Sequence, residues 1–538
     1  MSKLPNKDIR LKRLLEAGYF PEELPPPFVS SEFAKFRSHF EKFLDPKVQH
    51  SAYARYSVPR HNSARRTLGI PNPINYFFLA KELSDQWVEI RKFLRQSSIS
   101  EFKPIFDISG PRALFGIDFD HVETEISRLQ ALHNKCVRVD ISRFYPTVYT
   151  HSLGWALYTK KFVKANLHKT YKGSLGDRLD KLVRYCQENQ SIGLPIGPDT
   201  SRILSEIICV AIEKCIAEKI NLFSIKSVRY VDDIVIGLSI DDNPEQFVSN
   251  VASAFSEFGL EINIDKTKVI GKGERFHPEW VSMLRNYRIS HGTKRKVEIL
   301  EDYFKNAFYL SSDHERDNVL TYAVKRSRSF SINDDEWGYY ENYLYRSARY
   351  NTNSLAAVAQ ILIEKNHEML LKGKSIDISK AKALVTDTLK QYSPLGFDYE
   401  VSWVLFLCKA LKISLNSSEI APVLSMTSPT CALIAIDLQN LGFLPKRLDL
   451  KYWRSFANAD GLRSEMWLFA YEIAQKGWLS TIPKDYVKND PNFSKLLAKS
   501  VYFYDENKNV RSTSSERKKA ATQLWKIKFI TSRWDEYF

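Results

Sequence analysis

The pattern of apolar and polar positions changes character near residue 290. Before that point, short apolar runs with strand-like spacing alternate with stretches whose apolar residues recur at helical spacing. After it, amphipathic helical stretches dominate, with glycine and proline between several of them; examples are residues 353–371, 378–389, 399–411 and 429–441. The chain is therefore expected to combine an α+β part with an all-α part built like stacked helices or a bundle.

The first part has a definite order of elements. Strands are predicted at residues 137–141, 227–231, 234–238 and 260–264, and helices at residues 152–164, from 198–199 onward and at 244–258. The two middle runs are separated only by Asp232 and Asp233, which is typical of a β-hairpin. Residues 52–80 contain no acidic side chain and are predicted to form short strands carrying a basic loop.

These patterns predict three parts. Residues 1–50 form a basic, partly helical extension, residues 51–290 form the α+β domain, and residues 291–538 form an α-helical, repeat-like domain. A chain of 538 residues is long enough for several domains.

Composition narrows the class of protein. Hydrophobic residues make up 44% and charged residues 26%, which is normal for a globular protein. The formal net charge of +15 indicates a polyanionic partner, with nucleic acid as the first expectation. The six cysteines form no C-x-x-C pair, the first residues lack a signal-peptide pattern, and no apolar run is long enough to span a membrane. We therefore expect a reducing, cytoplasmic compartment and no membrane partner.

Three aspartates are the candidates for chemistry. Asp140 ends the apolar run 137–141, and Asp232 with Asp233 occupies the predicted hairpin tip. Aspartate is common in solvated turns, and the pair alone would favour that interpretation. The flanking apolar strands weaken it, because like charges about 4 Å apart repel by about 4 kcal/mol at an effective dielectric of about 20. A divalent cation would offset this repulsion, and pairs of Mg²⁺ ions held by carboxylates catalyse nucleotidyl transfer.

The sequence around these aspartates resembles reverse transcriptases. YVDD at residues 230–233 is similar to their central signature, and VDISRFY at residues 139–145 is similar to their earlier aspartate motif. GLPIGPDTS at residues 193–201 resembles the segment that contacts template and incoming nucleotide, and LEINIDKTK at residues 260–268 resembles the following motif. Residues 58–73 resemble the fingers. The resemblance covers about residues 50–290 and implies a fingers-and-palm fold with RNA-directed DNA polymerase activity.

The resemblance implies roles in catalysis for five positions. Asp140, Asp232 and Asp233 would bind two Mg²⁺ ions, which Mn²⁺ could replace, and the backbone carbonyl of Ile141 would join them. Lys266 would be the general acid for pyrophosphate, with a simple surface lysine as the alternative.

Five further positions are implied in binding deoxynucleoside triphosphates. Arg65 and Arg66 would hold the triphosphate, because an arginine fork suits phosphate oxygens; the alternative is a solvated basic face. Tyr145 would be the aromatic gate that rejects a ribose 2′-hydroxyl, with a core tyrosine as the alternative. Ile196 and Gly197 would lie beside the template and the incoming nucleotide.

Ile196 stands where retroviral enzymes commonly carry glutamine. An aliphatic residue there, followed by Asp199-Thr200-Ser201, resembles the bacterial abortive-infection, or anti-phage defence, reverse transcriptases. A helical domain in place of a thumb agrees with this resemblance. It implies a bacterial homo-oligomer whose DNA synthesis need not copy a template and can start on a protein hydroxyl, which leaves the DNA covalently attached to protein.

Two other functions stay open at this stage. The first is a template-copying enzyme of the retron or group II intron kind, working with a dedicated RNA. The second is an inactive palm reused as a nucleic-acid-binding scaffold, against which the three intact aspartates argue.

Three features of the helical part add expectations. Tyrosine clusters at residues 339–345 and 502–504 offer hydroxyls for priming, with ordinary packing as the alternative for each. Trp453, Trp467 and Trp478 are expected at an assembly surface. The basic segment 508–528 is expected to be either a solvated helix or a nucleic-acid contact.

Overall fold

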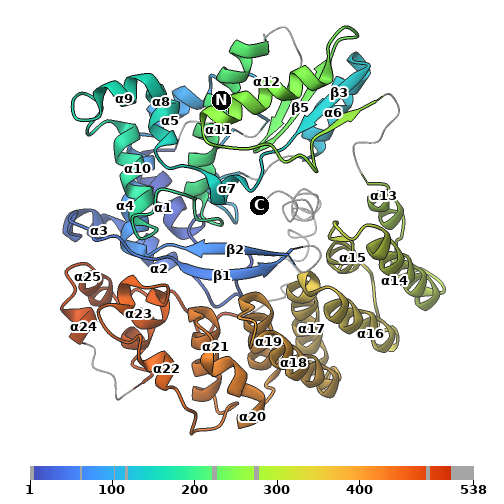
Figure 1. The fold of residues 1–538 in the computed structure, drawn as a ribbon. Coiled ribbons are helices and arrows are strands. Elements are labelled where there is room, and N and C mark those ends of the chain that lie inside the picture. The colour runs from blue at the N-terminus through green and yellow to red at the C-terminus, as the bar shows by residue number, and fades with distance from the viewer. Residues whose placement is uncertain are drawn as a thin grey trace.

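The structure is a computed structural model that describes residues 5–60, 64–101, 103–115, 119–220, 227–271, 278–479 and 485–509. In Figure 1 a sheet with its helices lies at the top, a two-stranded hairpin crosses the middle, and helices form an arc along the lower and right sides. Most of the basic segment predicted at residues 508–528 lies outside the described residues.

A four-stranded antiparallel sheet, in the order β4-β5-β3-β6, forms the centre of the α+β part. Its strands are β3 (Lys135–Val139), β4 (Ser227–Tyr230), β5 (Asp233–Leu238) and β6 (Lys268–Ile270). Helix α6 (Phe119–Leu132) packs on β4 and β5, and α12 (Pro244–Glu257) packs on β3. Val139 pairs with Ile234, so Asp140, just after β3, and Asp233, the first residue of β5, lie at the same end of these two inner strands.

Two predicted elements differ from the structure. The strand expected at residues 260–264 is only an isolated antiparallel bridge between Ile262 and Ile141, in which Asn263 N–H donates to the Asp140 carbonyl. A turn at residues 264–266 follows it, and the ladder of the sheet resumes in β6. The helix expected at residues 152–164 is two helices, α8 (Ser152–Tyr158) and α9 (Lys160–Asn166). They separate at Thr159, which has a φ of 67° and whose hydroxyl caps α9.

The hairpin and the first helices share a core with the end of the chain. The hairpin consists of β1 (Ala54–Pro59) and β2 (Arg65–Ile70), and it is followed by α4 (Pro73–Asp85). The extension predicted at residues 1–50 contains α1 (Lys7–Glu16), α2 (Ser31–Lys35) and α3 (Arg37–Phe43), of which α1 packs on α4. Tyr19 and Phe33 of this segment contact the ring of Phe503. The extension is therefore packed into the core.

Other helices of the α+β part connect the sheet to the hairpin. They are α5 (Trp87–Leu94), α7 (Phe144–Thr147), α10 (Leu175–Tyr185) and α11 (Asp199–Ile220). Helix α11 packs on α5, α8 and α12, so it runs through the middle of this part. The α+β architecture expected from the sequence is confirmed.

The remaining helices form the expected all-α part. They are α13 (Trp280–Arg285), α14 (Lys296–Asp313), α15 (Val319–Ser327), α16 (Asp334–Tyr350), α17 (Leu355–Leu370), α18 (Ile378–Tyr392), α19 (Asp398–Leu411), α20 (Ser417–Ile420), α21 (Pro429–Asn440), α22 (Lys451–Arg454), α23 (Trp467–Lys476), α24 (Asp485–Lys488) and α25 (Phe493–Ala498). Helix α19 packs between α18 and α21, and α21 packs on α23. Within the described ranges, no helix combines the length and apolar character needed to cross a membrane.

The helical part docks on the hairpin through the beginnings of its helices. Before α17, the Asn353 amide donates to the Arg60 carbonyl at 3.0 Å. At the start of α19, the Asp398 carboxylate accepts from Ser57 N–H at 2.8 Å. These bonds hold the helical arc against the strand β1.

The expectation of an exposed tryptophan surface is wrong for two of the three residues. Trp453 and Trp467 are fully buried, and their indole N–H groups donate to the carbonyls of Met426 and Ile70. Trp478 is partly buried against the core. These large rings fill the interior of the helical part instead of covering its surface.

Candidate active site

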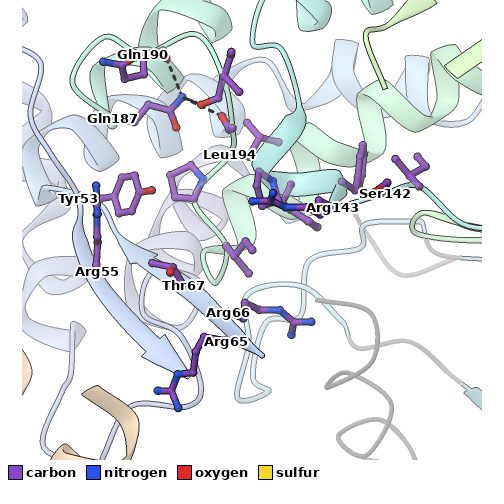
Figure 2. A pocket seen from close by; sticks show the side chains of 18 of the residues that line it. Tyr53, Arg55, Arg65, Arg66, Thr67, Ser142, Arg143, Gln187, Gln190 and Leu194 are labelled. Carbon is purple, nitrogen blue, oxygen red and sulfur yellow. Dashed lines mark hydrogen bonds between the residues drawn. The ribbon is translucent and has the colours of Figure 1, made fainter. Parts of the chain in front are cut away.

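A cavity of about 690 Å³ lies between the hairpin, the helical part and the end of the sheet that carries Asp140 and Asp232. It is lined by residues of β1 and β2, by the segments 140–146 and 187–196, and by Asp232. Ser464 and Glu465 extend its wall from the helical part. Arg66, Arg143 and Tyr53 are among the side chains around it in Figure 2. The cavity is polar and rich in arginine, which suits a polyanionic substrate.

A buried ion-pair network supports the tip that carries Asp232. Arg229, which is 1% exposed, donates to both oxygens of Glu206 at 2.7 and 3.0 Å and also binds Glu213. The same guanidinium donates to the Val231 carbonyl at 2.8 Å. Val231 has a φ of 50°, a left-handed conformation that is costly for a β-branched residue. The bond from Arg229 therefore holds the strained residue that turns Asp232 toward the cavity.

Asp232 is a buried carboxylate with incomplete hydrogen bonding. It is 7% exposed, and its Oδ1 has no hydrogen-bond partner among the described residues. Burial raises the pKa of Asp232 well above its ordinary value, and nearby Asp140 raises it further while Lys266 opposes this. A buried, unpartnered oxygen next to a second carboxylate is the environment that a divalent cation would stabilise.

Asp140 faces the same cavity at the end of β3. Lys266 lies 3.0 Å from its Oδ2, and the Asn263 amide donates to that oxygen at 3.4 Å. Ile141, whose carbonyl was predicted as a ligand, lines the cavity beside it and bridges to Ile262. The structure therefore brings Asp140, Asp232, Ile141 and Lys266 together, as the sequence prediction requires.

Asp233 is placed differently from the other two aspartates. Arg138 binds it through two nitrogens, one at 3.0 Å and one at 2.5 Å, and Asp233 is not among the cavity-lining residues. Burial raises the pKa of Asp233, and Arg138 opposes this effect. In the described parts of the chain, no three His, Cys, Asp or Glu side chains gather to hold a metal. Mg²⁺ is nevertheless commonly bound by one or two carboxylates together with substrate phosphates, and Asp140 with Asp232 fits that donor set.

The predicted sugar gate Tyr145 and the template-segment residue Ile196 line the cavity, whereas Gly197 is not among its lining residues. Tyr145 is 4% exposed, and its hydroxyl lies 3.0 Å from the Ser205 hydroxyl, which fixes the ring against α11. The Ile196 carbonyl accepts from Gly69 N–H at 2.8 Å, so the predicted template segment is tied to β2. Gly197 has a φ of 120° and packs on Pro21, where a side chain would clash.

The two arginines predicted to bind triphosphate point in different directions from β2 (Figure 2). Arg65 donates to both oxygens of Glu400 and to Ser57, and its guanidinium lies 3.7 Å from the centre of the Phe397 ring. Although Arg65 borders the cavity, its charge is already paired with the helical part. Arg66 extends on the other side of the strand, toward the cavity.

Sequence reasoning missed the residues that support the site from behind. Arg229 lies in an apolar strand and Glu206 on an apolar helix face, and a charge at such a position requires a buried partner. That signal was available in the sequence, although it does not say which charges pair. Ser464 and Glu465 carry no such signal, because only the tertiary fold brings them to the cavity.

The fold and the site place two aspartates at the ends of strands inside an arginine-rich cavity, an arrangement that suits metal-assisted nucleotidyl transfer. In agreement, residues 81–300 match the family model described as reverse transcriptase (RNA-dependent DNA polymerase). Residues 81–300 are therefore similar to a reverse-transcriptase domain. The matched range includes Asp140, Asp232 and Lys266 and leaves out the hairpin with Arg65 and Arg66.

Comparison with individual proteins gives a similar solved structure and no curated relative. Among solved structures, telomerase from Candida albicans in complex with a TWJ fragment of telomeric RNA is similar at 12% identity with a TM-score of 0.29. The similarity covers 62% of this chain, and this chain spans 65% of that telomerase chain.

Proposed function

We propose that the chain polymerises deoxynucleoside triphosphates into DNA at Asp140 and Asp232, using two Mg²⁺ ions. The observation that carries this proposal is the buried oxygen of Asp232, which no described residue partners, beside Asp140 and inside a cavity lined with arginines. The bound ions would activate the attacking hydroxyl and stabilise the leaving pyrophosphate.

The residues of the chain have separate tasks in this reaction. Asp140 and Asp232, with the Ile141 carbonyl, would hold the ions, which would supply charge stabilisation for the reacting phosphate. Arg66 neutralises the triphosphate, because a guanidinium donates in a fork that matches phosphate oxygens. The Lys266 ammonium lies 3.0 Å from the Asp140 carboxylate, next to the place where the pyrophosphate would leave. It serves as the general acid that protonates the pyrophosphate. The Tyr145 ring excludes the ribose 2′-hydroxyl. For Arg65 and Asp233, the predicted roles would require release from Glu400 and Arg138.

We further propose that the polymerase serves bacterial anti-phage defence and starts DNA on a protein hydroxyl. The support is the aliphatic Ile196 in the template segment and the contribution of the helical part to the cavity lining at Ser464 and Glu465. The tyrosine clusters named from sequence do not carry this proposal, because none of them lines the cavity. Tyr340, Tyr345 and Tyr504 are buried in the helical part.

A labelled nucleotide tests the proposal. The protein is incubated with Mg²⁺ and labelled deoxynucleotide without primer or template, then denatured, with nuclease treatment of half the sample. Label that migrates with denatured protein and collapses onto it after nuclease is the expected result. Label released cleanly in denaturant, with synthesis dependent on an added RNA, would replace this proposal by the template-copying one. Asp232→Asn is the negative control.

We also propose homo-oligomerisation in a bacterial cytoplasm. The support is a set of exposed leucines on the helical part, Leu370, Leu371, Leu395 and Leu441, which are 50–79% exposed. Light scattering of the full chain at micromolar concentration is expected to give a multiple of 62.4 kDa. A single species at the monomer mass would overturn this part.

A further inference from the structure

Lysines crowd the surface of α9 and the loop that follows it. From residue 141 to residue 176 the chain contains no acidic side chain. The second half of that stretch carries five lysines and one histidine, namely Lys160, Lys161, Lys164, His168, Lys169 and Lys172. All six are exposed, and we call this group the α9 surface.

The charge of the α9 surface is not neutralised by the rest of the described structure. Lys161, Lys164, Lys169 and Lys172 make no ion pair with a described carboxylate. Two acids at the borders are engaged elsewhere: Glu257 binds Lys219 at 3.0 Å, and Asp177 accepts from Gly173 N–H at 2.8 Å. The uncompensated positive charge favours a polyanion.

Apolar side chains lie among these lysines. Phe162 and Leu167 are 39% and 50% exposed, and the ring of Phe162 stacks on that of Tyr158 with centroids 6.2 Å apart. Trp155 lies under Lys160, whose nitrogen is 4.3 Å from the ring centre. Phosphate-binding lysines beside exposed rings are the combination that binds single strands, because unpaired bases stack on aromatic side chains.

The α9 surface is held in a fixed shape. Val163 and Tyr171 are 4% and 5% exposed and anchor the helix and its following loop in the core. The Thr159 hydroxyl caps the helix, and Lys160 donates to the Glu257 carbonyl at 3.0 Å. Lysines presented by an anchored element lose less conformational freedom on binding than lysines of a flexible tail.

We propose that the α9 surface binds single-stranded DNA, namely the strand that the polymerase makes. This proposal rests on the proposed function. The segment ending at Pro146 lines the cavity, and α8, which has seven residues and is about 10 Å long, connects that region to α9. A DNA strand that is still attached at the active site is present near the α9 surface at a high effective concentration. RNA free in solution lacks this advantage.

Binding of labelled oligothymidylate, followed by fluorescence anisotropy over a salt series, tests the proposal. All proteins are full-length and carry Asp232→Asn, so that binding is measured without synthesis. The test variant is K161Q/K164Q/K169Q. The control K374Q/K390Q/K446Q removes the same charge from exposed lysines of the helical part. Unchanged thermal unfolding shows that both variants are folded.

The expected result follows from counterion release. Loss of three phosphate contacts should make the slope of log affinity against log salt shallower by about 2, and affinity at about 0.1 M salt should fall at least about tenfold. The control should bind like its parent. Equal binding by the test variant and the control would overturn the proposal, and so would stronger binding of duplex DNA or oligouridylate through the same lysines.

Synthesis is measured separately with the active enzyme. K161Q/K164Q/K169Q should shorten the DNA product while leaving addition of the first nucleotide unchanged. If the wild-type chain makes no DNA but oligothymidylate binding still depends on these lysines, the proposed function fails and the binding surface remains. If the wild-type chain makes DNA but the lysine substitutions do not change oligothymidylate binding, only this inference fails.

Discussion

Two buried aspartates of the α+β part, Asp232 and Asp199, lie in opposite electrostatic environments: the pKa of Asp232 is raised and that of Asp199 is lowered. Asp199, at the start of α11, is fully buried and accepts from Arg112 at 2.8 Å, from Arg202 at 2.9 Å, and from two backbone N–H groups. Burial alone would raise the pKa of Asp199, but the two arginines outweigh it and hold the pKa below its ordinary value. Asp232 is almost as buried, yet its pKa is raised and one oxygen lacks a donor among the described residues.

The difference teaches that burial of a charge does not by itself mark a functional site. A buried charge with its full set of donors stabilises a fold once formed, as Asp199 does for the loop–helix junction. A buried charge without that set needs a ligand to complete it. Among the described groups around Asp232, Lys266 opposes the charges of two neighbouring carboxylates, Asp140 and Asp233.

Removing the charge of Asp232 should have the largest effect on activity. Asp232→Asn is expected to lower nucleotide incorporation at least about 1000-fold, because a metal supplies several kcal/mol of transition-state stabilisation. Its melting temperature should not fall, since the substitution removes an uncompensated buried charge. Asp233→Asn is the matched comparison, with a loss expected below about tenfold because Arg138 already binds Asp233. Equal losses in single-nucleotide incorporation would contradict this division between neighbours.

Asp199→Asn should show the reverse pattern. It leaves Arg112 and Arg202 without their buried counter-charge, so the free energy of unfolding should fall by about 3–5 kcal/mol. Chemical denaturation measures this directly. The protein that remains folded should keep its KM for nucleotide. A stable Asp199→Asn protein with a large loss of activity would assign Asp199 to the chemistry and break the comparison.

A third buried aspartate gives a pH-dependent test. Burial raises the pKa of Asp398 to about 6 from 3.8, so its folded form binds a proton more tightly than its unfolded form. Its stabilising effect is complete below pH 3.8 and is lost as the pH rises through about 6. Asp398→Asn should therefore stabilise the protein by about 3 kcal/mol at pH 8 and have no effect near pH 4. A constant difference across pH in denaturation experiments would contradict the assignment.

Substitutions of the two adjacent arginines of β2 should have different effects, one on nucleotide binding and the other on the stability of the fold. Arg66→Gln is expected to raise the KM for deoxynucleotide about tenfold, equivalent to about 1.4 kcal/mol, with little change in melting temperature. Arg65→Gln should lower the melting temperature, because it leaves the buried Glu400 without its counter-charge, and should change KM less. Steady-state kinetics and thermal unfolding of both variants decide this. If Arg65→Gln instead raised the KM and Arg66→Gln lowered the melting temperature, Arg65 would be shown to leave Glu400 and bind substrate.

The sequence was sufficient to predict the hairpin tip, the strand before Asp140 and the helical second half. These features depend on local apolar patterns and on turn residues, which operate over a few positions. It could not predict that Arg65 is paired, because its partner Glu400 lies 335 residues away. The pairing of Asp233 with Arg138 also depends on which strands become neighbours, which the periodicity of one strand does not reveal.

Binding of Mn²⁺, followed by electron paramagnetic resonance, tests the central claim most directly. The wild-type chain with a non-hydrolysable deoxynucleotide is expected to bind Mn²⁺ at the site of Asp140 and Asp232. Asp232→Asn should lose that binding while remaining folded, and Asp233→Asn should retain most of it. Undiminished Mn²⁺ binding by the Asp232→Asn protein would contradict the assignment of the buried tip as the cation site of a DNA polymerase.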